Sequence, residues 1–347
     1  MKKEIEICDR RIGSGHPILI TAEVGVTHNG DIEKAKELVD VVNESGADAA
    51  KFIFWFREEL MSDKNITYSY NTEHGKVTEN MYDMMKNYKF SLDEWRELKR
   101  YSDERNTILF STAPTMNAIQ WAEEVGLEAY KLSSWDFNHH PLWRKIASIG
   151  KPMLIDTGPV KTLDVAKVMS IMKEEENDKS VLVHCFHTDN HEEMNMRSLP
   201  YMQEAFRTLV GYSSKDQNTE TDIIAVTLGV SYLEKRLTLD RDLPGHHQVL
   251  SLEPDEFDEY VDMIRNVRKA LGVKDLRPSA ADLEERERWF RRIVADEDIP
   301  EGTTLTADML EGKRPGTGIS PEYMNFFIGR TVKRDIEYNE AILWDDV

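Results

Sequence analysis

Short apolar runs alternate with amphipathic stretches along most of the chain. The apolar runs have the length and composition of buried β-strands, and each is followed by a segment with apolar residues at helical spacing. The runs occupy residues 17–26, 47–55, 107–113, 128–134, 151–158, 180–186, 208–214 and 230–238. Eight strand–helix units in this order predict a (β/α)8 TIM barrel. A doubly wound open sheet is the alternative, but no extended segment is present that would reorder the strands.

Local signals place some element boundaries. Ser91 followed by Glu94 forms a capping box that predicts the start of a helix over residues 91–106. The long insertion before it, residues 57–90, is polar and rich in Met and Tyr, and we interpret its methionines as packing residues. We interpret His28, in the Thr-His-Asn-Gly-Asp segment, as part of a turn.

The character of the chain changes after Gly272, which predicts three segments. Residues 1–272 form the barrel, and residues 273–288 form a charged linker that becomes helical. Residues 289–347 contain short β-type runs separated by Pro-Glu-Gly and Pro-Gly turns. This last segment predicts a small β-rich domain that is marginally stable alone.

Composition restricts the class of protein. With 347 residues, 40% hydrophobic and 31% charged, the chain is typical of a soluble globular protein. The first ten residues lack the apolar core of a signal peptide, and Cys8 and Cys185 give no disulfide framework, so we expect a cytoplasmic location. The net charge of −20 argues against nucleic acid and anionic membranes as partners. A small anionic substrate would then need a local basic pocket.

Ionisable and hydroxyl side chains end all eight predicted strands. Active sites of TIM barrels lie at these carboxyl ends. Basic groups there would bind an anion, and Glu23, Asp156 and Glu234 would transfer protons or orient hydroxyls. Each residue alone could be a solvated strand end, but their convergence predicts one site. The candidates are Glu23, Lys51, Ser111, Thr112, Lys131, Ser134, Asp136, Asp156, His187, Asp189, Ser213, Lys215, Glu234 and Arg236.

The last predicted strand carries both signs of charge. Because side chains alternate along a strand, Glu234 and Arg236 share a face and Lys235 points the other way, towards the helices. Cys185 has no evident base partner and is interpreted as a core cysteine. No spacing typical of metal ligands is present, and the adjacent pair His246 and His247 would be a poor chelate.

Several of these segments resemble the sialic acid synthase family in sequence and order. They include "TAEVGVTHNGD", "AYKLSS", "GYSS" and "LEKRLTLDRDLPG". The segment "IVADEDIPEGTTLTADMLEGKRPGTGIS" is similar to the family's antifreeze-protein-like domain, of β-clip type. The resemblance covers nearly the whole chain. It implies a barrel that condenses phosphoenolpyruvate with an N-acylated aldose to give a sialic-acid-like nonulosonic acid, usually with a divalent metal such as manganese.

The resemblance also implies roles for individual residues. Glu23 would lie near the sugar, and Arg314 would reach it from the partner chain of a domain-swapped homodimer. The phosphoenolpyruvate site would comprise Lys51, Thr112, Lys131, Ser134 and Ser213. We expect the two lysines to neutralise the phosphate and carboxylate.

The chain departs from the family pattern where the metal is expected. The family's two metal-binding histidines correspond to Lys215 and Arg236, which are protonated at neutral pH and are poor metal ligands. We therefore expect no metal cofactor, and the hypothesis is that these two cations replace the metal's charge. His247 stands where an acidic sugar contact is usual, and Asp156 where a serine is usual.

Further changes affect the region that would bind the sugar. His187 and Asp189 replace the family's residues after the sixth strand, and Ile53 replaces a glutamine. Two other functions stay open. One is a Schiff-base aldolase or lyase with Lys131 or Lys51 as nucleophile, and the other is a catalytically lapsed paralogue that binds a sugar acid.

Overall fold

The computed structural model describes residues 4–188, 190–314 and 318–347, and its main feature is a closed barrel of eight parallel strands. The last strand pairs with the first, so the open-sheet alternative is wrong and the predicted barrel is confirmed. In chain order the strands are β3 (Leu19–Glu23), β4 (Ala49–Ile53), β7 (Ile108–Thr112), β8 (Tyr130–Leu132), β9 (Met153–Asp156), β10 (Ser180–His184), β11 (Leu209–Ser213) and β12 (Tyr232–Arg236).

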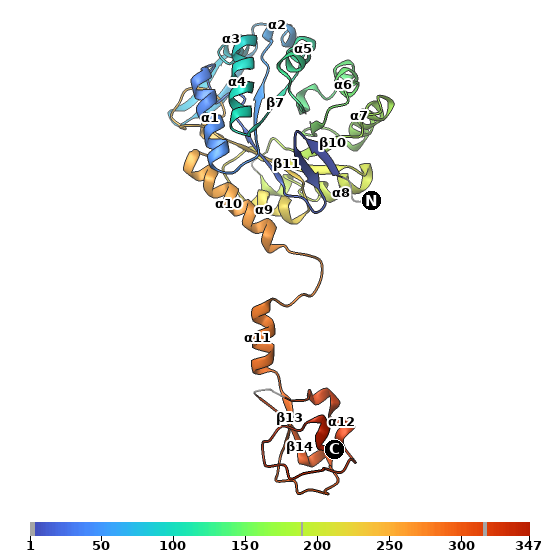
Figure 1. Ribbon diagram of the computed structural model, residues 1–347. Helices are drawn as coiled ribbons and strands as arrows, with labels where there is room; N and C mark the ends of the chain where they lie inside the picture. The colour runs from blue at the N-terminus through green and yellow to red at the C-terminus, as the bar shows by residue number, and fades with distance from the viewer. Residues whose placement is uncertain (1–3, 189, 315–317) are drawn as a thin grey trace. The chain divides into compact units, whose positions relative to one another are not determined.

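Helices surround this barrel, as Figure 1 shows. They cover the outer face of the strands, where their apolar sides pack against outward-pointing strand residues in the largest core cluster. They are α1 (Ile32–Glu44), α4 (Leu92–Glu104), α5 (Met116–Val125), α6 (His140–Ala147), α7 (Thr162–Glu174), α8 (Ser198–Phe206), α9 (Glu220–Thr227) and α10 (Pro254–Ala270).

Both local signals read from the sequence are confirmed. Ser91 and Glu94 form the capping box at the start of α4. In the turn before α1, the Nδ1 atom of His28 accepts a hydrogen bond from the Gly30 amide at 3.0 Å, and the ring stacks on Phe90. Burial lowers the pKa of His28 to about 3, so this histidine is neutral and structural.

Lys235 points towards the helices, as the strand alternation predicts. It is fully buried, and its Nζ donates to Asp222 Oδ2 at 3.0 Å and to Ser214 Oγ at 2.9 Å. Its neighbours Glu234 and Arg236 therefore face the barrel interior. The alternation therefore places the structural ion pair of Lys235 and Asp222 on the helix side of the strand. Glu234 and Arg236 lie on the side that faces the barrel interior.

Two parts of the barrel unit were not predicted as regular structure. The chain begins with the hairpin β1 (Glu4–Ile7) and β2 (Arg10–Gly13). The insertion after β4 contains α2 (Arg57–Leu60), the antiparallel pair β5 (Thr67–Thr72) and β6 (Gly75–Asn80), and α3 (Met81–Lys86). Met84 and Met85 are buried, which agrees with their interpretation as packing residues.

The chain divides into two compact units, Met1–Gly272 and Val273–Val347. The second unit begins with α11 (Ala280–Trp289), which occupies much of the expected linker. Strands β13 (Arg292–Ala295) and β14 (Leu310–Lys313) pair antiparallel, α12 (Met324–Phe327) follows, and a separate core forms around Ile293 and Phe327. No helix in the described parts of the chain is long and apolar enough to cross a membrane.

Candidate active site

A cavity of about 780 Å³ opens at the carboxyl ends of the barrel strands. It is the end at which TIM barrels carry their chemistry. All the predicted site residues line this cavity except Ser111, Lys131, Asp189 and Arg314. Those lining it are Glu23, Lys51, Thr112, Ser134, Asp136, Asp156, His187, Ser213, Lys215, Glu234, Arg236 and His247.

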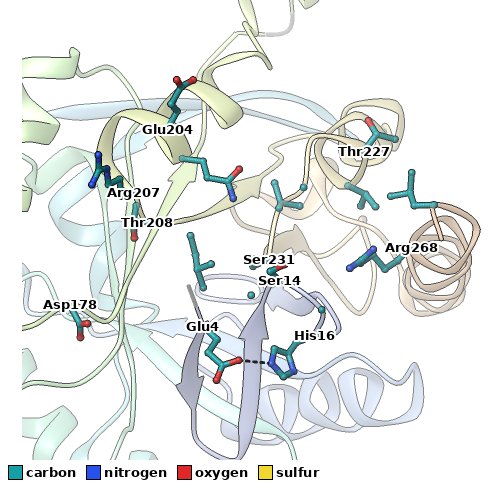
Figure 2. A pocket seen from close by; sticks show the side chains of 18 residues that line it. Glu4, Ser14, His16, Asp178, Glu204, Arg207, Thr208, Thr227, Ser231 and Arg268 are labelled. Atoms are coloured by element: carbon teal, nitrogen blue, oxygen red, sulfur yellow. Dashed lines mark hydrogen bonds and ion pairs between the residues drawn. The ribbon is translucent and has the colours of Figure 1, made fainter. Parts of the chain in front are cut away.

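A larger cavity, about 1230 Å³, lies at the opposite end of the barrel. Figure 2 shows that its labelled side chains include Glu4 and His16, which are hydrogen-bonded at 2.9 Å. Arg207 follows α8 and Arg268 lies on α10, on opposite sides of the view, so they do not form a common anion site. Cavity size therefore does not identify the active site here, whereas strand direction and residue chemistry do.

The remaining predicted residues are placed differently. Ser111 is buried on β7, Asp189 lies outside the described residues, and Arg314 is an exposed residue of the second compact unit. Lys131 is only 1% exposed and lies on β8, below the cavity. Its ammonium group is already paired with Asp156 on the neighbouring strand β9 and with Glu234 across the barrel on β12, which favours a positioning role over the expected contact with substrate.

An ion-pair network forms the floor of the cavity. Lys131 Nζ lies 3.0 Å from Asp156 Oδ1 and 2.5 Å from Glu234 Oε2. Burial alone would lower the pKa of Lys131, but Asp156 and Glu234 together raise it well above its ordinary value. Lys131 is therefore a poor candidate for the neutral nucleophile of a Schiff-base enzyme.

The two carboxylates of this network differ in protonation. Burial favours the neutral form of both, but Lys131 and Lys51 hold the pKa of Glu234 well below its ordinary value. Hydroxyl donors add to this, since Ser213 Oγ and Tyr232 Oη donate to Glu234 at 2.8 and 2.6 Å. Burial dominates for Asp156, whose pKa rises to about 6 despite Lys131. Glu234, whose ionised form is favoured, thus lies beside a carboxyl able to exchange a proton near neutral pH.

A second pair, Lys51 and Glu23, spans β4 and β3. The Lys51 ammonium donates to Glu23 Oε2, and Glu23 Oε1 accepts from the Gly25 amide at 3.0 Å. Neighbouring strands hold both in register, since Glu23 is paired with Lys51 on one side and with Arg236 on the other. Unlike Lys131, both residues line the cavity.

Lys215 and Arg236 are the cavity's cations without a carboxylate partner. No ion pair within 4.0 Å joins either one to a carboxylate among the described residues. Arg236 Nη1 donates to the Lys215 carbonyl oxygen at 2.9 Å, which fixes the two relative to each other. Burial, assisted by Arg236, lowers the pKa of Lys215 to about 8.

These two residues do not fit the divalent metal that the family resemblance implies. A protonated ammonium and a guanidinium present hydrogen-bond donors and no lone pair. In the described parts of the chain, no group of three or more His, Cys, Asp or Glu side chains is arranged to hold a metal ion.

The outer wall of the cavity is mostly apolar and aromatic, and apart from Ile53 its residues were not predicted from the sequence as part of a site. Much of this wall comes from the insertion after β4, whose contacts could not be predicted from local patterning. Trp135 is 72% exposed at the cavity mouth, 4.8 Å from the His187 ring, and its place between the candidates Ser134 and Asp136 is the sequence signal that could have identified it. The wall residues are Ile53, Trp55, Leu60, Met61, Tyr68, Met81, Met84, Met85, Trp135 and Leu250.

Histidines complete this wall in neutral form. Tyr88 Oη lies 3.2 Å from His246 Nδ1, and the His246 and His247 rings are 4.3 Å apart. His247 adopts a positive φ of 77°, and its buried Nδ1 has no hydrogen-bond partner. Burial, with Arg236 nearby, holds the pKa of His247 well below its ordinary value, so its ring can accept or donate one hydrogen bond without charge.

Ser134 is held in place by a close approach to Gly158. A Cβ atom at residue 158 would collide with the Ser134 side chain, and Gly158 has a φ of +44°. Gly158→Ala is expected to lower the free energy of unfolding by about 1–3 kcal/mol and, if Ser134 has its predicted role in substrate binding, to raise KM. Urea unfolding and steady-state kinetics measure both effects.

Gly126→Ala is the matched control for that substitution. Gly126 also has a positive φ, +83°, but a Cβ there would meet nothing within 4 Å. The Gly126→Ala variant should lose stability through backbone strain and leave KM unchanged. Equal KM values for the two variants would contradict the role given to Ser134.

Comparisons with known proteins agree with this architecture. The NeuB family model matches residues 38–275, and the SAF domain model matches residues 290–347. The chain is 32% identical to human N-acetylneuraminate-9-phosphate synthase, over 99% of this chain and 96% of that protein. It is 28% identical to N,N'-diacetyllegionaminic acid synthase of Legionella pneumophila, over 96% of each.

A solved structure is similar as well. The N-acetylneuraminic acid synthetase of Leptospira borgpetersenii, crystallised with citrate, is 27% identical with a TM-score of 0.73, covering 83% of this chain and 96% of that one. The family model covers most of the barrel, and the ordered motifs and the second unit agree with it. The chain therefore belongs to the NeuB family and carries a C-terminal SAF domain.

Proposed function

We propose that this protein is a synthase that condenses phosphoenolpyruvate with an N-acylated aldose, giving a sialic-acid-like nonulosonic acid, by a metal-independent route. Family membership supports the general reaction, since relatives over the full chain are sialic, legionaminic and pseudaminic acid synthases. The observation that supports the metal-independent part is that Lys215 and Arg236 line the cavity as cations with no carboxylate partner among the described residues.

The reaction needs positive charge where negative charge develops. When C3 of phosphoenolpyruvate adds to the aldehyde carbon, the aldehyde oxygen becomes an alkoxide. Lys215 and Arg236 would stabilise this oxygen by charge-assisted hydrogen bonds, and a protonated group would then convert it to a hydroxyl. Water adds to C2, and phosphate leaves as the C2 carbonyl forms. The two cations would thus supply the positive charge of a metal ion. Unlike a metal ion, they could not coordinate several ligands at once.

The other residues would bind and orient the substrates. Lys51 and the hydroxyls of Thr112, Ser134 and Ser213 are available in the cavity for the phosphate and carboxylate. Glu23 would orient or deprotonate a sugar hydroxyl. Lys131 would act indirectly, as a positioning residue that holds the Glu234 and Asp156 carboxylates in the floor.

The acceptor sugar would contact a further set of cavity residues. Asp136, His187 and His247 line the outer part of the cavity, where an acceptor would extend from the floor. Burial raises the pKa of Asp136 to about 6, so it could donate as well as accept. We further propose that Asp189 contributes to this region and that Arg314 reaches the sugar from the partner chain of a homodimer.

The test is simultaneous measurement of phosphate and keto-acid product from phosphoenolpyruvate and a panel of N-acyl aldoses. The proposal predicts equimolar phosphate and a nine-carbon keto acid with at least one acceptor. Tight binding of phosphoenolpyruvate with no product across the panel would favour the lapsed paralogue instead. Sedimentation of the full chain, together with Arg314→Ala kinetics, tests the homodimer and its shared arginine.

A further inference from the structure

The cavity contains one partly buried lysine, Lys215, whose surroundings differ from those of the buried lysines in the described part of the barrel. Lys51 is bound by Glu23, Lys131 by Asp156 and Glu234, and Lys235 by Asp222 behind the strand. Lys215 lines the cavity and has no side-chain hydrogen bond or ion pair within the described parts of the chain. Of these four lysines, Lys215 is therefore the one whose amine can lose its proton without breaking an ion pair.

The position of Lys215 suits covalent chemistry. It follows strand β11 by two residues, at the end of the barrel where substrates enter. Its backbone is fixed by Arg236, whose guanidinium also faces the cavity and can bind a carboxylate through two parallel hydrogen bonds. A small acid held by Arg236 would then present its adjacent carbon to the amine of Lys215.

We propose that Lys215 forms a Schiff base with 2-oxo acids, giving this pocket a covalent activity in addition to the proposed condensation. The neutral amine adds to the keto carbon, and the keto oxygen leaves as water with the two amine protons, so that C=O is replaced by C=N. No oxidant, reductant or metal is needed. The inference does not rest on phosphoenolpyruvate turnover, because pyruvate alone is the probe.

The charged surroundings make the reaction pH-dependent. The ionisable groups that act on Lys215 include Cys185 after β10, Asp156 on β9, Arg236 on β12 and Lys131 on β8, and the neutral rings of His187 and His247 also lie near it. Burial has the largest effect and lowers the pKa of Lys215 to about 8. Because only the neutral amine adds to a carbonyl, the rate of adduct formation should rise as the pH increases through about 8. For an ordinary lysine the midpoint of this rise would lie near pH 10.4, about two units higher.

The experiment is borohydride trapping of the full-length protein with pyruvate. The expected result is one reduced pyruvate adduct per chain by intact mass, assigned to Lys215 by peptide mapping. Lys215→Arg keeps a positive charge but cannot form an imine, so trapping should disappear. Lys167→Arg, at an exposed position on α7 outside the cavity, is the matched control and should still be trapped.

The outcomes separate this inference from the proposed function. No adduct in the wild-type protein, an adduct mapped to another residue, or undiminished trapping in Lys215→Arg would overturn it. If Lys215→Arg does not fold, peptide mapping of the wild-type adduct still decides. If pyruvate is trapped on Lys215 but no phosphate is released from phosphoenolpyruvate, the covalent site is supported and the proposed condensation is rejected.

Discussion

Arg236→Met is expected to lower kcat for phosphate release by about 10²–10³-fold, the usual effect of removing one preorganised donor to a developing oxyanion. Arg236 is 9% exposed at the end of β12, with its backbone in register with Glu23. Methionine keeps most of the side-chain volume and removes the charge, so the loss should appear mainly in kcat. Steady-state phosphate release at saturating phosphoenolpyruvate measures this effect.

Two further variants separate charge from packing. Arg236→Lys keeps a cation and should retain more activity than Arg236→Met. In the double variant Lys215→His with Arg236→His, two imidazoles replace the cations at the family's metal positions, and activity should become dependent on added manganese. Arg236→Met activity within a few-fold of wild type would contradict the role of this guanidinium.

Lys131→Met is expected to reduce the free energy of unfolding by about 3–5 kcal/mol, because it leaves two buried carboxylates without their cation. Asp156 and Glu234 both bind the Lys131 ammonium group, and no other cation lies within 4.0 Å of either carboxylate among the described residues. Urea unfolding at pH 7 measures the loss. Lys167→Met, at a half-exposed position on α7, is the control and should change stability by less than about 0.5 kcal/mol.

The pH dependence of Lys131→Met gives an independent check. Without Lys131, burial raises the folded-state pKa of Asp156 and Glu234 above their unfolded values of about 4. The protonated folded form is then favoured at low pH, and this stability is lost as the pH rises through the folded-state pKa values. The deficit relative to wild type should therefore be smaller near pH 4 than at pH 7. A deficit independent of pH would show that lost packing, and not charge, is responsible.

The sequence was sufficient for the barrel because its signals are local. Each strand is a short apolar run, each helix has its own periodicity, and the alternation along β12 correctly separates Lys235 from Glu234 and Arg236. The strand-end rule likewise locates the cavity, since parallel strands bring their carboxyl ends to one edge.

Depth within the barrel was harder to predict. Lys51 and Lys131 look equivalent in the sequence, because each follows apolar residues on a strand, yet only Lys51 lines the cavity. The difference depends on which layer of the barrel each residue occupies, and strand register and the carboxylates across the barrel set that layer. Periodicity within one strand contains neither piece of information.

The outer wall depended on long-range contacts. Strand β6 is largely exposed and shows no alternation, and β5 alternates only between exposed and half-buried residues, so neither has the fully buried positions that identify a core strand. Tyr68 on β5 lies 5.5 Å from the ring of His246, far away in sequence, and such a contact leaves no local signal. The acceptor side of the pocket could therefore be outlined only from the structure.

The metal dependence of phosphate release tests the central claim most directly. Purified protein is treated with EDTA, and turnover of phosphoenolpyruvate with an accepted aldose is measured before and after manganese is added. The account predicts the same rate in both conditions, because Lys215 and Arg236 supply the positive charge. Loss of turnover in EDTA, with recovery on adding manganese, would contradict it.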